Sequence, residues 1–361
     1  TYIANSQVGD SGACATALFC GVKGNFETVG LDPSGRYQDC STARSAHVPC
    51  LFDWAHAEGK SRMDAIALSV LPWRMTVRSL AGKWTGIVTN TRITHATPAG
   101  LYAHSPSRYW EDDVRLSEQV LSGDLHGSPC KDIARQLVED SPGKHIRVRG
   151  TARPRFQVVF GGGRRHLMPL GTKDPGDERE EGRRRDGRNL ILDWVEQQRK
   201  AGRNGSYIWN GQQLRDLDPF KTDAVLGLFG HSHLSFEMDR NPEEPSLVEM
   251  TRKAVQILRR SPKGFLLVVE GSFRFRVRYR EVKRSRLIFD DDERAAGRMD
   301  HAHHFNNAAR ALDEVLSLEA SVEAAMELVD TSRTIVVVGG DHSHSLTLGG
   351  QAPRGNPILG L

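Results

Sequence analysis

Four short apolar runs, each followed at once by small or polar residues, constrain the fold of this chain most strongly. They are GIVTNT at 86–91, FQVVFGGG at 156–163, GFLLVVEG at 264–271 and TIVVVGGDH at 334–342. Continuous apolar runs of this kind are typical of strands buried on both faces, which are parallel strands. Helical patterns lie between them, at 130–140, 189–200, 245–260 and 305–330. The alternation predicts an α/β fold, a three-layer α/β/α sandwich around a central, mostly parallel sheet.

The composition fits a globular protein with a substantial core, because 38% of the 361 residues are apolar. The chain starts on Thr1, has no signal-peptide pattern and no apolar run of about 18 residues, so we expect an internal fragment. Its five cysteines show no CxxC spacing. This argues against a zinc knuckle and permits one disulfide plus free thiols. The sequon Asn204-Gly205-Ser206 is compatible with a secretory route.

Three segments are basic and match no neighbouring pattern, namely 61–83, 144–155 and 272–296. Their combined charge is more positive than the formal net charge of +4, so the rest of the chain is acidic. The third contains FRFRVRYR, which suits an amphipathic strand or a basic ribbon against nucleic acid. The alternative that we favour is an inserted loop or translated intron sequence, so we expect no nucleic-acid partner.

Carboxylates and histidines follow the apolar runs, where ligands collect in open parallel sheets. Asp341 and His342 leave the last run together, and Asp300 and His304 stand four apart on one helical face. Glu270 closes a very apolar strand, where an unpaired charge is costly. Carboxylate oxygen and imidazole nitrogen suit zinc. One Asp-His pair alone is equally compatible with a solvated turn, but two such clusters in one chain favour a metal site.

The first residues supply a candidate nucleophile. In GDSGACATALFCGVK, at 9–23, Ser11 precedes a helical pattern, and a helix N-terminus attracts an anion. The alternative is that Asp10 or Ser11 only caps the helix, and the pattern alone does not decide between them. Arg108 follows a strand at 86–91, and arginine grips phosphate through two parallel hydrogen bonds.

Taken in order along the chain, these motifs resemble the animal alkaline phosphatases. The resemblance runs through DSGACATALFCGVKGNFETVG, GIVTNTRITHATPAGLYAHSPSRYW, CKDIARQL, VVFGGGRR, YIWN, LGLF, PSLVEM, SPKGFLLVVEG, GRMDHAHH and GGDHSHSLTLGGQAPRGNPILGL. It covers nearly all of the chain outside the three basic segments. It implies a single alkaline phosphatase-like catalytic domain over 1–361, truncated at both ends, with atypical insertions at 61–83, 144–155 and 272–296.

The resemblance also implies roles for individual residues. Ser11 would be the nucleophile that becomes phosphoseryl, Arg108 would clamp the phosphate, and Asp10 would orient that arginine. The matched ligands are Asp300 and His304 for the first of two zinc ions, Asp341, His342 and Ser11 for the second, and Thr97 and Glu270 for one magnesium. His95 and His301 match residues that line the phosphate and the magnesium-bound waters.

Two structural features follow from the same resemblance. Asp193, Phe229 and Glu244 occupy plausible positions for a calcium site, although Gly230 stands where a carboxylate ligand is usual. Cys40 and Cys130 match the disulfide pair of the family, which fits an extracellular setting.

The implied function is broad hydrolysis of small phosphate monoesters by a homodimer, either secreted or held at the cell surface by a lipid (GPI) anchor beyond this chain. Two ligands usual in the family, an upstream aspartate and a downstream histidine, do not match any residue of the chain, and 272–296 separates Glu270 from Asp300. A non-catalytic metal- or anion-binding remnant is therefore the alternative. A phosphodiesterase or sulfatase is disfavoured, because those use a threonine or a modified cysteine where this chain has Ser11.

Overall fold

The computed structural model of the protein describes residues 2–56, 83–119, 130–140, 146–148, 151–153, 156–271 and 297–344. Most of the three basic segments lies outside these ranges. Their status as insertions therefore stays a prediction.

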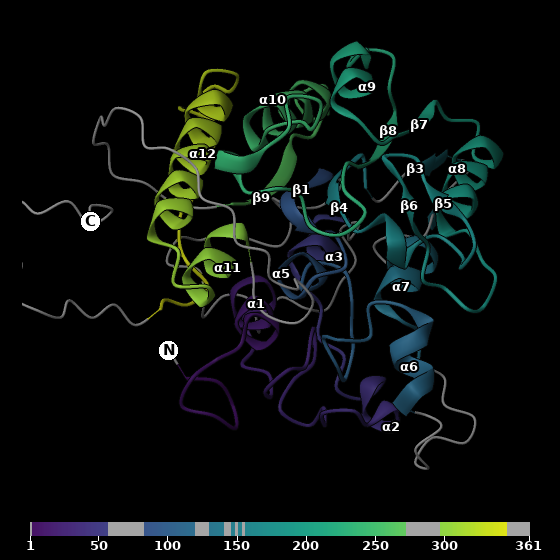
Figure 1. Ribbon diagram of the computed structural model, residues 1–361, viewed down its shortest axis with the longest axis vertical. Helices are drawn as coiled ribbons and strands as arrows, with labels where there is room; N and C mark the ends of the chain where they lie inside the picture. The colour runs from purple at the N-terminus through teal and green to yellow at the C-terminus, as the bar shows by residue number, and fades with distance from the viewer. Residues whose placement is uncertain are drawn as a thin grey trace, which may run out of the picture.

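A five-stranded, fully parallel sheet forms the centre of the molecule (Figure 1). Its order is β7 (Gly205–Ile208), β8 (Ala224–Leu228), β4 (Val158–Gly162), β1 (Trp84–Arg92) and β9 (Phe265–Glu270). Three of the four predicted runs are strands of this sheet. The predicted α/β class is confirmed, and the parallel pairing follows from helical connections that cover both faces.

Alternate side chains of each strand enter two separate cores. On β4, Val159 packs with α1 (Ser11–Cys20), α3 (Leu51–His56), α7 (Ile133–Glu139) and α8 (Leu190–Lys200). Its neighbours Val158 and Phe160 pack on the opposite face with α9 (Gly211–Asp216) and α10 (Leu247–Leu258). The long helix α12 (Ala308–Met326) lies against α10, outside the sheet (Figure 1). Burial on both faces explains why the strands read as continuous apolar runs.

Shorter elements complete the described fold. They are α2 (Cys40–Ala43), α5 (Ala96–Ala99), α6 (Asp113–Gln119), α11 (Arg298–His304), the 3-10 turns η3 (Arg164–His166) and η4 (Glu237–Asp239), and two hairpins, β2 (Ile146–Val148) with β3 (Thr151–Arg153) and β5 (Lys173–Asp174) with β6 (Asp177–Glu181). The β2–β3 hairpin lies within the basic segment 144–155 and apart from the central sheet.

Helix boundaries follow side-chain caps visible in the sequence. The hydroxyl of Ser246 accepts from the amide of Glu249, whose carboxylate accepts from the amide of Ser246, so a capping box opens α10. Asn189 caps α8 and Asn307 caps α12 in the same way, each accepting a backbone amide three residues on. These caps place the helix starts within a few residues of the predicted ones.

The run at 334–338 is not a strand among the described residues, so this prediction was wrong. The residues are extended, and Ile335 and Val337 are 67% and 85% exposed. The apolar pattern is compatible with a strand, but a strand forms only where the edge of a sheet offers backbone hydrogen bonds. The last strand of the sheet, β9, has partly buried residues throughout and pairs only with β1 in the described structure.

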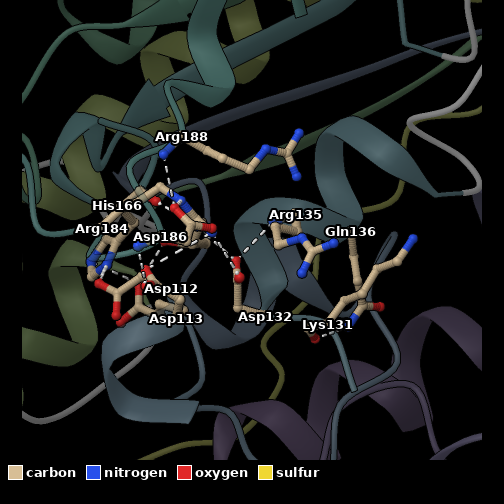
Figure 2. A network of polar contacts seen from close by, with 12 residues as sticks. Asp112, Asp113, Lys131, Asp132, Arg135, Gln136, His166, Arg184, Asp186 and Arg188 are labelled. Carbon is tan, nitrogen blue, oxygen red and sulfur yellow. Dashed lines mark hydrogen bonds and ion pairs between the residues drawn. The ribbon is translucent and has the colours of Figure 1, made fainter. Parts of the chain in front are cut away.

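Covalent and ionic links tie the loops to this frame. The predicted Cys40–Cys130 disulfide forms, and a second, unpredicted one joins Cys20 at the end of α1 to Cys50 before α3. Arg184 is fully buried between two carboxylates: it donates to Asp132, the N-cap of α7, at 3.0 and 3.1 Å, and contacts Asp186 (Figure 2). This network attaches the loop after β6 to α7.

Candidate active site and metal centre

The N-terminus of α1 presents Ser11. Asp10 is the N-cap, because its carboxylate accepts from the amide of Gly12 at 2.9 Å. Ser11 is buried, and its Oγ lies 2.9 Å from Nε2 of His342. The capping role thus falls to Asp10, and the Ser11 hydroxyl faces a side chain that is 331 residues away in the sequence.

Asp10 also holds Arg108 beside this helix end. Nη1 of Arg108 donates to Oδ2 of Asp10 at 3.1 Å, and the other Asp10 oxygen accepts from the amide of Glu27 at 2.9 Å. Both side chains of the pair are 9% exposed. A guanidinium carries five N–H donors, so Arg108 keeps donors to offer an anion in front of α1.

The turn after β1 brings His95 and Thr97 to the same place, because α5 packs against α1. His95 is the N-cap residue of α5. Burial, and then the charges of Arg92 and Arg108, keep the pKa of His95 well below its usual value, so its ring is neutral. Nδ1 of His95 and Oγ1 of Thr97 are buried and lack a hydrogen-bond partner among the described residues.

Glu270, at the end of β9, is held by three donors. The hydroxyls of Thr89 and Thr91 donate to Oε2 at 2.5 and 3.0 Å, and the amide of Gly297 donates to Oε1 at 3.0 Å. The last contact joins the two ends that flank 272–296. Glu270 and α11 therefore meet in space, and the separation of Glu270 from Asp300 in the sequence does not keep them apart.

Asp300 is the centre of a carboxylate–histidine cluster at the start of α11. Its Oδ2 lies 3.5 Å from Nε2 of His304, one turn on, and its Oδ1 lies 3.9 Å from Nδ1 of His342 and in contact with Nε2 of His344. Nε2 of His342 lies 3.3 Å from Oδ2 of Asp341. Ligand atoms of Asp300, His342 and His344 lie within 4.8 Å of one another, a spacing that suits one metal ion.

Unsatisfied oxygens in this cluster fit divalent cations. Oγ1 of Thr97 is buried without a hydrogen-bond partner among the described residues. Oδ2 of Asp300 and Oδ2 of Asp341 are also buried, and the histidine nitrogens 3.5 and 3.3 Å from them do not form hydrogen bonds with them. Burial raises the pKa of Glu270 and of Asp341. Repulsion from a neighbouring carboxylate, Asp341 for Glu270 and Asp300 for Asp341, raises each pKa further. Ionised carboxylates in such surroundings are stabilised by a nearby cation. The donor set therefore matches the predicted metal chemistry.

Sequence reasoning missed His233. Its ring lies 4.4 Å from that of His301 and 5.2 Å from that of His95, centroid to centroid. Burial and the charge of Arg92 hold the pKa of His233 well below its usual value, and Nε2 lies 2.6 Å from Nη1 of Arg92. The available signal was HSH at 231–233, separated from the end of β8 by Phe229 and Gly230, a polar tail like those used for the other strands.

The three residues proposed for calcium are not joined by any contact among the described residues. Asp193, on α8, forms an ion pair with Arg188. Glu244 accepts from the amide and the hydroxyl of Ser235, at 2.8 and 3.1 Å, and Phe229 is buried just after β8. The calcium site stays a prediction.

Comparison with known proteins agrees with this fold and shows the family. The alkaline phosphatase family model matches residues 1–275 and 295–361. The chain belongs to the alkaline phosphatase family. The unmatched residues, 276–294, fall within the basic segment 272–296, whereas 61–83 and 144–155 lie inside the matched range.

Curated relatives match over the whole chain. The tissue-nonspecific alkaline phosphatase of Gallus gallus is 37% identical over 365 residues, with 100% of this chain and 58% of the relative covered. An alkaline phosphatase of Gadus morhua is 36% identical with 62% of its length covered, and a membrane-bound one of Bombyx mori is 35% identical with 54% covered. The chain thus spans little more than half the length of these relatives.

Solved structures support the fold. Thermus thermophilus alkaline phosphatase superposes with a TM-score of 0.55 at 24% identity, covering 90% of this chain and 45% of that one. The enzyme of the Antarctic bacterium TAB5 gives 0.54 at 16% identity, covering 91% and 63%. A mutant of the TAB5 enzyme is described with Mg bound in its M3 site.

Proposed function

We propose that the protein hydrolyses small phosphate monoesters, with Ser11 as the nucleophile. The observation that supports this most directly is the position of Ser11 Oγ at the start of α1, 2.9 Å from His342 and next to the Asp10–Arg108 pair. A phosphate in front of the helix would meet backbone amides, the hydroxyl and the guanidinium together.

In this proposal each residue has one task. Ser11 attacks phosphorus, the ester oxygen leaves with the alcohol, and the serine carries the phosphoryl group until water displaces it as inorganic phosphate. Arg108 holds two non-bridging oxygens, and Asp10 fixes the plane of its guanidinium. Since these contacts grip only the phosphate, we expect a broad range of leaving groups.

Two zinc ions and one magnesium complete the proposed site. Asp300 and His304 would hold the first zinc, Asp341, His342 and Ser11 the second, and Thr97 and Glu270 the magnesium, with His95 and His301 lining the phosphate and its waters. The buried oxygens of Asp300, Asp341 and Thr97, which make no hydrogen bond among the described residues, support this assignment. Bound zinc supplies Lewis-acid chemistry, which lowers the pKa of a hydroxyl and stabilises charge on an oxygen.

The setting and assembly are also proposals. Two disulfides favour an oxidising, extracellular environment, and the Bombyx mori relative is named as membrane-bound. No helix in the described part of the chain is both long and apolar enough to cross a membrane. From the family resemblance, we propose a secreted or cell-surface protein with a lipid anchor outside this chain, active as a homodimer.

The decisive test is Ser11→Ala in the full-length protein, purified with its metals. We expect p-nitrophenyl phosphate hydrolysis at alkaline pH to fall about 10³-fold or more, because no neighbouring hydroxyl replaces the nucleophile. Ser45→Ala, at an exposed serine outside α1, is the control and should retain most activity. Wild-type-like hydrolysis by Ser11→Ala would reject the assignment.

This chain of 361 residues should by itself bind zinc weakly. Its second zinc pair, Asp341 and His342, follows an extended run with no strand partner in the described structure. Metal analysis after dialysis should therefore show less zinc than in the full-length protein. Equal and stoichiometric retention in both would show that this chain alone completes the sites, and would count against the remnant alternative.

A further inference from the structure

A strained turn after α1 lies beside the Asp10–Arg108 pair. The amide of Thr28 donates to the carbonyl of Asn25 at 3.2 Å, which closes a turn with Glu27 in its third position. Glu27 has a φ of 59°, in the left-handed region that disfavours residues with a side chain. Glycine or asparagine usually occupies such a position, so this backbone conformation costs free energy that the surrounding contacts must offset.

Hydrogen bonds hold the turn on both sides of Glu27. Before it, the amide of Phe26 donates to the side-chain oxygen of Asn5 at 2.8 Å. After it, the hydroxyl of Thr28 donates to the carbonyl of Asn25 at 2.8 Å, in addition to the amide contact. The neighbours of Glu27 therefore impose its conformation, against the intrinsic preference of the residue.

The backbone of Glu27 joins the two residues of the pair. The segment after α1 runs antiparallel to the segment that carries Arg108, because Val29 and Ser105 exchange two backbone hydrogen bonds at 2.9 and 2.8 Å. Beyond them, the amide of Arg108 donates to the carbonyl of Glu27 at 2.9 Å. The amide of Glu27 donates in turn to Oδ1 of Asp10 at 2.9 Å.

The side chain of Glu27 adds a third contact. Its Oε1 accepts from the hydroxyl of Tyr109 at 2.6 Å. Burial, and then this hydrogen bond, raise the pKa of Tyr109, so the phenol stays protonated and remains the donor. Tyr109 follows Arg108 in the chain and lines the same cavity as Arg108 and His95. The carboxylate thus holds the residue next to the guanidinium.

These contacts close a ring around Arg108. Its amide is bound to Glu27, and its Nη1 donates to Oδ2 of Asp10 at 3.1 Å. The other oxygen of Asp10 is bound to the same Glu27. A shift of Glu27 would therefore move both the backbone of Arg108 and the carboxylate that orients its guanidinium.

We propose that Glu27 is a positioning residue, whose strained backbone holds Asp10 and Arg108 in the geometry that binds phosphate. The inference rests on the proposed phosphomonoesterase activity and deepens it, because it names what sets the position of the phosphate-binding arginine. Glu27 acts only through the two residues that it holds. Since Arg108 binds the phosphate before and during the reaction, a displaced Arg108 should raise KM more than it lowers kcat.

The test compares two substitutions that differ in the backbone conformations they allow. A β-branched residue is strongly disfavoured at positive φ, so Glu27→Val should force the turn to move. In the full-length protein with its metals, we expect KM for p-nitrophenyl phosphate and the inhibition constant of inorganic phosphate to rise about tenfold or more, with kcat changed less than about threefold.

Glu27→Gly is the companion variant, because glycine adopts a positive φ at no steric cost. It keeps both backbone contacts and loses only the contact with Tyr109, so both constants should stay within about threefold of the wild type. An unchanged phosphate affinity in Glu27→Val would overturn the inference. An equally large loss in Glu27→Gly would overturn it too, because the backbone would then not be the cause.

Gly202→Val is the matched control for strain alone. Gly202 lies just after α8 with a φ of 67°, and a side chain added there would meet no described atom within 4 Å. This variant should lower the free energy of unfolding, as Glu27→Val does, and leave phosphate affinity unchanged. If it weakened phosphate binding as much as Glu27→Val, general destabilisation would explain both and the positioning role would be rejected.

A binding measurement separates this inference from the activity itself. Calorimetric titration of inorganic phosphate into Ser11→Ala, with and without Glu27→Val, measures phosphate binding without turnover. Weaker binding in the double variant supports the positioning role even if the wild type hydrolyses nothing, an outcome that would reject only the proposed function. Equal binding by both proteins, or no binding by either, would reject the positioning role.

Discussion

Two regions bring ligands to the candidate metal centre by different means. Ser11 and Glu270 lie at the ends of elements whose side chains pack in the two cores. The Asp10 cap fixes the helix start that carries Ser11, and hydrogen bonds from Thr89 and Gly297 fix Glu270. Asp341 and His342 instead follow the exposed run at 334–338, and side-chain contacts alone bring them to Ser11 and Asp300.

This difference matters for metal binding. A ligand held by a packed backbone loses little entropy when an ion binds, whereas one on an unpaired segment must be ordered at that moment. The packed region thus supplies a preformed half of the site. The extended segment supplies the other half at a cost in affinity.

The largest expected loss of stability comes from the packed region. Arg184→Ala removes the ionic partner of Asp132 and Asp186 and leaves the buried carboxylate of Asp132 without a cation. We expect the free energy of unfolding, measured by urea denaturation, to fall by about 3–5 kcal/mol. The control Arg179→Ala removes an exposed pair with Asp177 and should change it little. Similar losses in the two variants would contradict the buried role of Arg184.

A pH-dependent effect is expected in the packed region, where α12 meets β1 and η4. Glu314 accepts from Asn90 Nδ2 and from the amide of Glu237, both at 2.8 Å, and burial raises its pKa to about 7. The folded state then holds this proton more tightly than the unfolded chain does. Stability is highest below pH about 4.5 and falls as pH rises to about 7, by at most about 3 kcal/mol.

The measurement is the unfolding free energy between pH 4 and 8 for wild type and Glu314→Gln. The variant cannot titrate at this position, so this part of the slope should disappear. Glu319→Gln, on the same helix, is the control and should keep it. An unchanged slope in Glu314→Gln would show that other groups cause the pH dependence.

The smallest effect is expected in the extended segment. Val337→Lys places a charge on a side chain that is 85% exposed, so the free energy of unfolding, measured by urea denaturation, should change by less than about 0.5 kcal/mol. Val88→Ala, at a fully buried position of β1, should cost about 1–3 kcal/mol. A large loss for Val337→Lys in the full-length protein would show that this run becomes packed there.

Local sequence patterns were enough to predict three strands of the sheet and the first helix. The runs at 86–91, 156–163 and 264–271 are strands, because an apolar segment between helical patterns has few alternatives to a buried parallel sheet. The helix of Ser11 was likewise predictable from Asp10 and the residues that follow. These features depend on neighbours in the sequence, so a single chain reveals them.

Contacts between distant segments were decided by the tertiary structure. The sequence by itself determined the family, the parallel sheet and the candidate ligands at strand ends. Only packing showed that Gly297 returns to Glu270, that Cys20 pairs with Cys50, that His233 joins His95 and His301, and that 334–338 lacks a strand partner. The physical reason is that strand pairing and side-chain clustering depend on which surfaces meet in space, and residue spacing does not encode that directly.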